Sequence, residues 1–107
     1  RYGRRQRQMC IRDRYKELKQ KSPTSLKISL KQIRNASYMS LKDELIMEYR
    51  MVQRCVEIGD FFEGVRAMLV DKDRKPNWKP KNIQDVDETR VNLFFEDLGD
   101  LDLILTN

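Results

Sequence analysis

Residues 60–80 read DFFEGVRAMLVDKDRKPNWKP, and this stretch combines a short amphipathic helix with a connector that resists helix formation. Apolar side chains recur at helical spacing in its first half, which predicts a helix over 61–70. The prolines in its second half disfavour helical backbone for the residues before them, so residues 71–80 are predicted to be an irregular connector. Trp78 lies between these prolines and is expected to anchor the connector against the helices. The predicted apolar face of the helix consists of Phe61, Val65, Met68 and Leu69.

Polar residues at the start of this helix are predicted to cap its N-terminus by accepting hydrogen bonds from backbone N–H groups. Asp60 and Glu63 have the spacing of a capping box, in which each side chain accepts from the other residue's backbone N–H. Glu63 is therefore interpreted as a capping group rather than a general acid. Arg66 is expected to pair internally with Asp60 and Glu63 rather than bind a ligand phosphate. Gly64 costs about 1 kcal/mol relative to alanine inside a helix, and such a glycine often marks the close approach of another backbone.

A longer helix is predicted upstream, over residues 23–36. Ser22 can cap its N-terminus, and Pro23 suits the first helical position because the missing N–H is not needed there. The apolar face of this helix is expected to carry Leu26, Leu30 and Ile33.

The longest helix is predicted over residues 41–58. Ser40 and Asp43 have the spacing of a capping box at its start. Gly59 is expected to end it in a left-handed conformation with positive φ. The predicted apolar stripe is Leu41, Leu45, Tyr49, Val52 and Val56, widened by Met51 and Cys55.

The last helix is predicted over residues 88–98. Asp87 is expected to cap it and Gly99 to end it. Alternating leucines in residues 101–105 suggest a short extended tail. The expected apolar face is Val91, Phe94, Phe95 and Leu98.

These elements predict an all-α fold class with four short amphipathic helices and a Pro/Trp connector. No strand pattern, repeat or low-complexity segment is evident in the sequence. The Phe61/Phe62 and Phe94/Phe95 doublets are expected to lie in the core. The apolar stripes are wide, so we expect the helices to cover a larger body that this chain lacks. In isolation the chain is then expected to be partly molten or oligomeric, because large exposed apolar patches favour association.

The net charge of +5 resides entirely in the first segment of the chain. Residues 1–14 carry six arginines and one aspartate, whereas residues 15–107 carry 16 basic and 16 acidic side chains. The segment lacks hydrophobic periodicity and is predicted to be a disordered basic arm, either a solvated tail or a binder of nucleic acid or acidic lipid. The arm also resembles a peptide produced when sequencing-adapter DNA is translated with a gene. We favour this interpretation, so we expect an artefactual arm and natural sequence from near residue 15.

The residue inventory excludes several kinds of chemistry. The chain has no histidine, which excludes histidine-based triads, metal sites and general bases. Its four glycines form no phosphate-binding loop. Cys10 and Cys55 have neither metal-site nor disulfide-framework spacing, and Cys55 is expected to be a small buried hydrophobe. Asp71 and Asp73 are interpreted as part of a solvated loop rather than a cation site. We therefore predict no catalytic residue, no metal and no cofactor.

Basic residues surround Trp78 in the predicted connector. An anionic group such as a nucleotide phosphate could dock on them, although an ordinary charged loop has the same composition. The patch consists of Lys72, Arg74, Lys75, Lys79 and Lys81.

Four stretches resemble the C-terminal region of the 3-hydroxyisobutyryl-CoA hydrolases, a branch of the enoyl-CoA hydratase/isomerase (crotonase) superfamily. They are SPTSLKISLKQI (22–33), LKDELIMEYRMVQRC (41–55), the stretch 60–80 quoted above and FFEDLG (94–99). The resemblance implies an N-terminal crotonase core, a spiral of ββα units whose backbone amides form an oxyanion hole for the thioester. That core is missing here, so no catalytic residue is carried over.

What the resemblance implies for residues 15–107 is the C-terminal helical region of an acyl-CoA thioester hydrolase of valine catabolism, inactive without its core. Helices in this region close over the acyl-CoA site and contribute to subunit contacts, so Lys72 and Trp78 are expected to face CoA or a neighbouring subunit. The expected partners are acyl-CoA, the missing core and a homo-oligomer, with no nucleic acid and no membrane. The expected location is mitochondrial in a eukaryote and cytoplasmic in a bacterium. Two alternatives remain open: another crotonase-superfamily enzyme such as an enoyl-CoA hydratase, and a non-enzymatic basic-armed helical binding protein.

Overall fold

The computed structural model describes residues 3–105, and this part of the chain contains helices and turns but no strand. The all-α prediction is therefore confirmed. The described residues extend over 50 × 37 × 26 Å. The elements are α1 (Arg4–Gln20), α2 (Pro23–Ala36), α3 (Leu41–Glu57), α4 (Phe61–Val65), the π-helical turn η1 (Arg66–Val70), the 3₁₀ turn η2 (Ile83–Asp85), α5 (Glu88–Leu93) and the 3₁₀ turn η3 (Gly99–Leu101).

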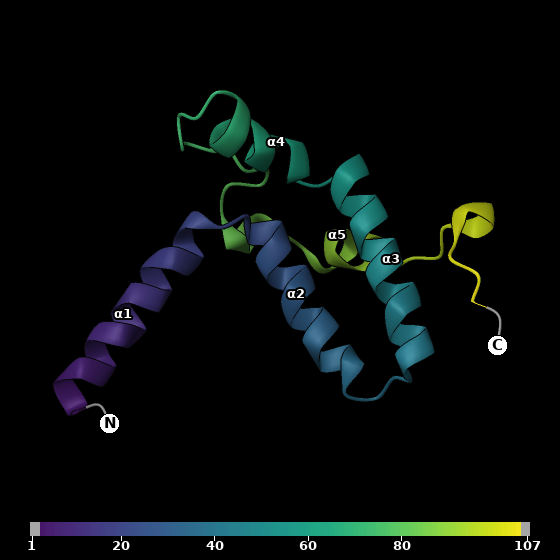
Figure 1. The fold of residues 1–107 in the computed structure, drawn as a ribbon, viewed down its shortest axis with the longest axis horizontal. Helices are drawn as coiled ribbons and strands as arrows, with labels where there is room; N and C mark the ends of the chain where they lie inside the picture. The colour runs from purple at the N-terminus through teal and green to yellow at the C-terminus, as the bar shows by residue number, and fades with distance from the viewer. Residues whose placement is uncertain (1–2, 106–107) are drawn as a thin grey trace.

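Helices α2 and α3 form an antiparallel pair joined by a short turn, and α5 lies between their upper parts (Figure 1). Helix α4 continues from the end of α3 at one end of this pair, and α1 projects away from it (Figure 1). The connector after η1 runs back from α4 toward the start of α2. Three parts of the chain that are far apart in the sequence therefore meet at this end of the pair: the start of α2, the junction of α3 with α4, and the connector.

The capping residues account for where α2 and α3 begin. The Ser22 hydroxyl accepts from the Ser25 N–H at 3.2 Å, with Pro23 at the first helical position. The Ser40 hydroxyl accepts from the Asp43 N–H, also at 3.2 Å. Both starts are as predicted, and α3 ends one residue earlier than expected.

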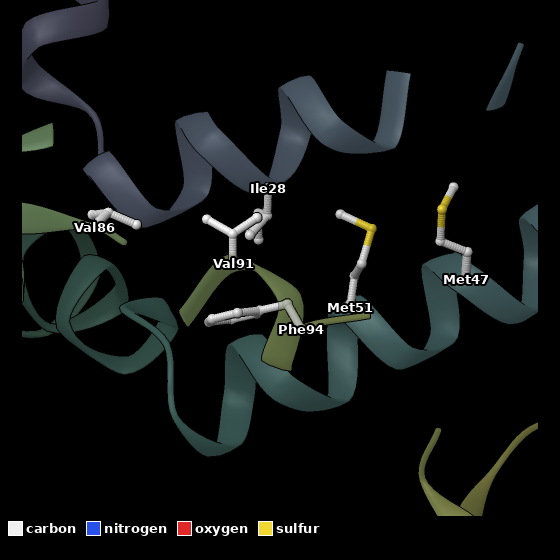
Figure 2. Packing of buried hydrophobic residues seen from close by; sticks show 6 residues of the cluster. All are labelled: Ile28, Met47, Met51, Val86, Val91 and Phe94. Carbon is white, nitrogen blue, oxygen red and sulfur yellow. The ribbon is translucent and has the colours of Figure 1, made fainter. Parts of the chain in front are cut away.

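A small core lies between α2 and α3 (Figure 2). Phe94 and Val91 project from the α5 segment into the space between Ile28 of α2 and Met51 of α3 (Figure 2). The buried cluster comprises Ile28, Met47, Met51, Val86, Val91 and Phe94. Partly buried Phe95 and Cys55 pack against it. The core prediction is therefore confirmed for the Phe94/Phe95 doublet.

The predicted apolar faces of α2 and α3 are wrong in part. Leu30 and Ile33 of α2 are 49% and 68% exposed, whereas Ile28 is buried. In α3, Met51 and Cys55 of the predicted stripe lie at the core together with Met47, which the prediction omitted. Four other residues of the stripe, Leu41, Leu45, Val52 and Val56, are exposed. Each helix therefore has one covered and one uncovered apolar face.

The Phe61/Phe62 doublet also departs from its predicted core position. The two rings pack edge to face at 5.7 Å, but their residues are 52% and 64% exposed. The helix they begin is continuous over the predicted 61–70, with α4 passing directly into the π-helical η1. Its buried residue is Ala67, whereas Met68 and Leu69 are exposed. The predicted apolar face of this helix is thus largely uncovered.

The basic arm differs from the prediction of disorder. Helix α1 covers Arg4–Gln20, and the Gly3 N–H donates to the Gln6 side chain at its start. The helix buries no residue, and every arginine in it is exposed. It thus gains no stabilisation from packing of its own side chains. Residues 1–2 of the predicted arm lie outside the described residues.

The two glycines that were predicted to end helices differ in conformation. Gly99 has a φ of +65°, as predicted for a left-handed position, but α5 itself ends earlier, at Leu93. Gly59 does not have the predicted positive φ. A Cβ there would lie 2.9 Å from the Cα and carbonyl oxygen of Cys55, so close backbone approach requires the glycine.

The turn η3 ends at Leu101, and Asp102 has the extended backbone predicted for the tail. Arg50 of α3 holds the tail there by donating to both carboxylate oxygens of Asp102, with its Nε 2.9 Å from Oδ1. The hydrogen bonds from Arg50 lower the pKa of Asp102 and thus keep that carboxylate charged.

Candidate functional site

Arg66 is the centre of a hydrogen-bonded network at the start of the connector. Its Nε and Nη2 donate to the two carboxylate oxygens of Glu63 at 2.9 and 2.6 Å. Its Nη1 donates to both Asp71 and Asp73 at 2.8 Å. Its Nη2 also donates to the Lys75 carbonyl oxygen at 3.3 Å. One planar guanidinium, with several donors in a fixed geometry, therefore ties the helix to both ends of the loop that follows.

Two carboxylates of the helix hold the connector further along. The Asn77 N–H donates to Glu63 at 2.6 Å, and the Lys79 N–H donates to Asp60 at 3.1 Å. Asp60 also accepts from the Ser22 hydroxyl at 2.6 Å, which links the connector to the start of α2. The capping-box prediction for Asp60 and Glu63 is wrong, because these carboxylates bind the connector and Ser22 instead of the helix N-terminus.

Trp78 lies between these two attachment points, as the expected anchor of the connector. Its indole N–H donates to the Gln20 carbonyl oxygen at 2.9 Å, across 58 positions of sequence. The ring passes so close to Gly64 that a Cβ there would lie 3.4 Å from it. The close approach expected at Gly64 is therefore that of the Trp78 ring and not of a backbone. A mostly apolar groove of about 550 Å³ lies beside the ring, between the start of α2 and helix α4.

Lys72 lies at the tip of the loop formed by residues 71–75. The residues on either side of it, Asp71 and Asp73, are both held by Arg66. Lys72 and Arg74 have φ angles of +56° and +57°, a left-handed backbone that is costly for a residue with a Cβ. The Arg74 N–H donates to the Ala67 carbonyl oxygen at 3.0 Å and closes the loop.

The cations of the connector are left without carboxylate partners. In residues 3–105, Arg66 takes up the charges of Glu63, Asp71 and Asp73. The neighbouring cations of the connector form no ion pair within the described residues. They are Lys72, Arg74, Lys75, Lys79 and Lys81. The resulting surface suits an anionic group, and Asp71 and Asp73 serve Arg66 rather than a cation.

The predicted pairing of Arg66 is confirmed for Glu63, whereas Asp60 bonds elsewhere. No group of three metal-ligating side chains occurs in the described range 3–105. Cys55 is half-buried beside the core, and burial raises the pKa of its thiol. Within the same range, no helix combines the length and apolar character needed to cross a bilayer.

Glu63 gives the network a defined response to acid. The Arg66 guanidinium, followed by the Asn77 N–H, lowers the pKa of Glu63 from its ordinary value of 4.5 to about 2. Because this pKa is depressed in the folded chain, the stabilising contribution is complete above pH 4.5 and is lost as the pH falls toward about 2. Acid titration through this window is expected to change the fluorescence of Trp78, the only tryptophan.

The matched control for this titration is Glu63→Gln, which keeps the side-chain shape without a titrating carboxylate. The variant is expected to lose the part of the fluorescence change that lies between about pH 4.5 and 2. Identical titration curves for the two chains would show that Glu63 does not hold the connector.

The fold and the connector define a helical segment with a rigid, cationic loop and apolar faces that remain partly uncovered. A sequence profile described as enoyl-CoA hydratase/isomerase matches residues 2–95. The chain therefore belongs to the enoyl-CoA hydratase/isomerase family.

Curated relatives carry a more specific name. The chain is 50% identical over 91 residues to "3-hydroxyisobutyryl-CoA hydrolase, mitochondrial" from Mus musculus, which covers 85% of this chain and 24% of the relative. It is 46% identical over 91 residues, with the same coverage, to the protein of that name from Homo sapiens. The Gallus gallus protein is 50% identical over 84 residues, 78% of this chain and 22% of the relative. The chain thus spans about a quarter of the length of these relatives.

Proposed function

We propose that this chain is the C-terminal helical region of a 3-hydroxyisobutyryl-CoA hydrolase. The observation that carries the proposal is the 50% identity, over 85% of the chain, to an enzyme of that name. In the reaction, the oxygen of water bonds to the thioester carbonyl carbon and the carbon–sulfur bond breaks. The products are 3-hydroxyisobutyrate and CoA, whose sulfur takes up a proton.

The contribution of this chain to that reaction is structural and substrate-binding. We assign no catalytic residue to it and propose that the oxyanion hole and catalytic acids belong to the upstream core that the family resemblance implies. The uncovered faces of α3 and α4 support a role in packing against that core, because exposed apolar patches of this kind mark interaction surfaces. Subunit contacts of a homo-oligomer belong to the same proposal.

Lys72 is the residue of this chain that we propose to contact CoA, with Trp78 fixing the connector beside it. Its exposed position, its left-handed backbone and its lack of a carboxylate partner within residues 3–105 support this role. A phosphate of the nucleotide end of CoA has the charge that such a cation binds.

The proposal is tested with a chimera in which residues 15–107 of this chain replace the matching quarter of the Mus musculus hydrolase. The chimera is expected to hydrolyse 3-hydroxyisobutyryl-CoA, whereas the mouse enzyme truncated before that quarter is expected to be inactive. A soluble, folded chimera without thioesterase activity would contradict the proposed function.

Within the chimera, Lys72→Ala is expected to raise KM for the CoA thioester about three- to tenfold with little change in kcat, as for the loss of one exposed phosphate contact. Arg34→Ala removes an exposed cation outside the connector and is expected to leave KM unchanged. A KM that is the same for both variants would remove Lys72 from the CoA site.

The second candidate is another crotonase-superfamily enzyme, such as an enoyl-CoA hydratase, which the description of the matching family profile favours. The two candidates differ in chemistry, because a hydratase adds water across a carbon–carbon double bond and leaves the thioester intact. Assaying the full-length natural protein for free CoA thiol and for loss of enoyl absorbance separates them.

The proposal also covers the cellular location of the protein and the origin of residues 1–14. The relatives are named mitochondrial, so we propose a mitochondrial enzyme. We further propose, from the resemblance of the arm to a translated adapter peptide, that residues 1–14 are not part of the natural protein. The family match to residues 2–95 includes most of this segment and is an observation against the proposal. Resequencing the transcript upstream of the Tyr15 codon is therefore the direct test. Arginine codons that persist there would contradict this part of the proposal.

A further inference from the structure

The Arg66 side chain holds the loop that carries Lys72 on both sides of that residue. Asp71 and Asp73 flank Lys72 in the sequence, and both accept from the same nitrogen of Arg66 at 2.8 Å. The Arg66 carbonyl oxygen also accepts from the Asp71 N–H at 2.8 Å. The tip of the loop is therefore fixed on both sides relative to Arg66, and Lys72 has little freedom to change its backbone.

Glu63 in turn fixes Arg66. It accepts from two of the three guanidinium nitrogens, so the plane of the guanidinium is set before it meets the loop. The same carboxylate accepts from the Asn77 N–H, which joins the loop to the segment that carries Trp78. Glu63 and Arg66 therefore connect the loop and the Trp78 segment through a single pair of side chains.

The backbone at the loop tip shows why such a pair is needed. Two residues with side chains adopt left-handed φ angles within three positions, at Lys72 and Arg74. Conformations of this kind persist where surrounding contacts over-determine them, and they are enriched at binding sites. Without the Arg66 contacts, Lys72 would sample the more favourable right-handed and extended regions, and its ammonium would move with it.

We infer that Glu63 and Arg66 are the positioning residues of the CoA contact, holding Lys72 where it meets the nucleotide end of an acyl-CoA thioester. This inference rests on the function proposed above. Neither residue touches the ligand in this role. Glu63 and Arg66 act through the loop, and Lys72 alone supplies the charge.

The test uses the chimera and two substrates, the acyl-CoA thioester and the corresponding pantetheine thioester, which lacks the nucleotide. Arg66→Lys keeps the charge but loses the planar fork that reaches three carboxylates. It is expected to raise KM for the CoA thioester about three- to tenfold and to leave kcat, and KM for the pantetheine thioester, within about twofold. Glu63→Gln is expected to act in the same direction, and Arg34→Ala is the surface control.

A double-mutant cycle separates positioning from general loss of structure. If Arg66 acts through Lys72, then Lys72→Ala combined with Arg66→Lys is expected to raise KM for the CoA thioester no further than Lys72→Ala alone. Additive effects, or an Arg66→Lys variant that loses kcat with both substrates, would overturn the inference. A KM raised by Lys72→Ala but unaffected by Arg66→Lys and Glu63→Gln would overturn it while leaving the proposed function intact. An unchanged KM in Lys72→Ala, in an active chimera, would overturn both the inference and the Lys72 contact.

Discussion

Phe94→Ala is expected to destabilise the chain by about 3–5 kcal/mol, the range typical of a phenylalanine removed from a packed core. Phe94 is 0% exposed and lies between the two long helices, in one buried cluster with Ile28, Val91 and Met51 (Figure 2). The guanidinium of Arg90 also lies 5.7 Å from the centre of its ring.

The expected loss from Phe94→Ala is large compared with the whole free energy of unfolding of a small domain. Small domains are stable by about 5–15 kcal/mol, and this chain buries few side chains completely. A chain with uncovered apolar faces is expected at or below the low end of this range, so losing Phe94 is expected to melt the α2–α3 pair. Helix content followed by far-UV circular dichroism in increasing urea measures the change.

Phe62→Ala is the matched control, because it removes the same atoms from a residue that is 64% exposed. It is expected to change the free energy of unfolding by less than about 0.5 kcal/mol. Equal urea midpoints for the two variants would show that the space between α2 and α3 is not a packed core.

The starts of the helices could be predicted because local hydrogen bonds determine them. Ser22 with Pro23 and Ser40 with Asp43 act over three or four residues, and such contacts can be inferred from spacing alone. Asp87 behaves in the same way, since it accepts from the Arg90 N–H at 2.8 Å. These contacts form whatever else the chain packs against.

The buried faces could not be predicted with the same success. Helix α3 carries apolar residues on two neighbouring sides, with Met47 and Met51 on one and Leu45 and Val52 on the other. Helical periodicity identifies both sets, but it contains no information on which set the rest of the chain covers. The choice depends on contacts with α2 and α5, which are distant in sequence.

The candidate site shows the same division. The Glu63–Arg66 pair follows from a spacing of three residues on one helix. The contacts of Asp60 with Ser22 and Lys79 span 38 and 19 positions, so no local sequence pattern predicts them. Arg90 is a further example, because it joins Thr24, the Ile58 carbonyl oxygen and the Lys79 carbonyl oxygen without belonging to any motif.

Charges placed on the uncovered face of α3 are expected to be tolerated in the isolated chain but to impair the chimera. Leu45→Glu combined with Val52→Glu places two charges on the face that the described residues leave exposed, at 41% and 59% exposure. In the isolated chain the change is expected to reduce self-association and to leave helix content unaltered, because Met47 and Met51 still fill the core. Sedimentation velocity and circular dichroism measure the two effects.

In the chimera the same double variant is expected to lower thioesterase activity more than tenfold, since docking on the upstream core would bury unpaired carboxylates. Lys42→Gln with Gln53→Glu changes the net charge equally but alters exposed polar positions of α3, and it is expected to preserve activity. Full activity in the Leu45/Val52 variant would mean that this face stays in water in the whole enzyme. The apolar stripe of α3 would then need another explanation, because the packing proposed here requires that the upstream three quarters of the protein cover it.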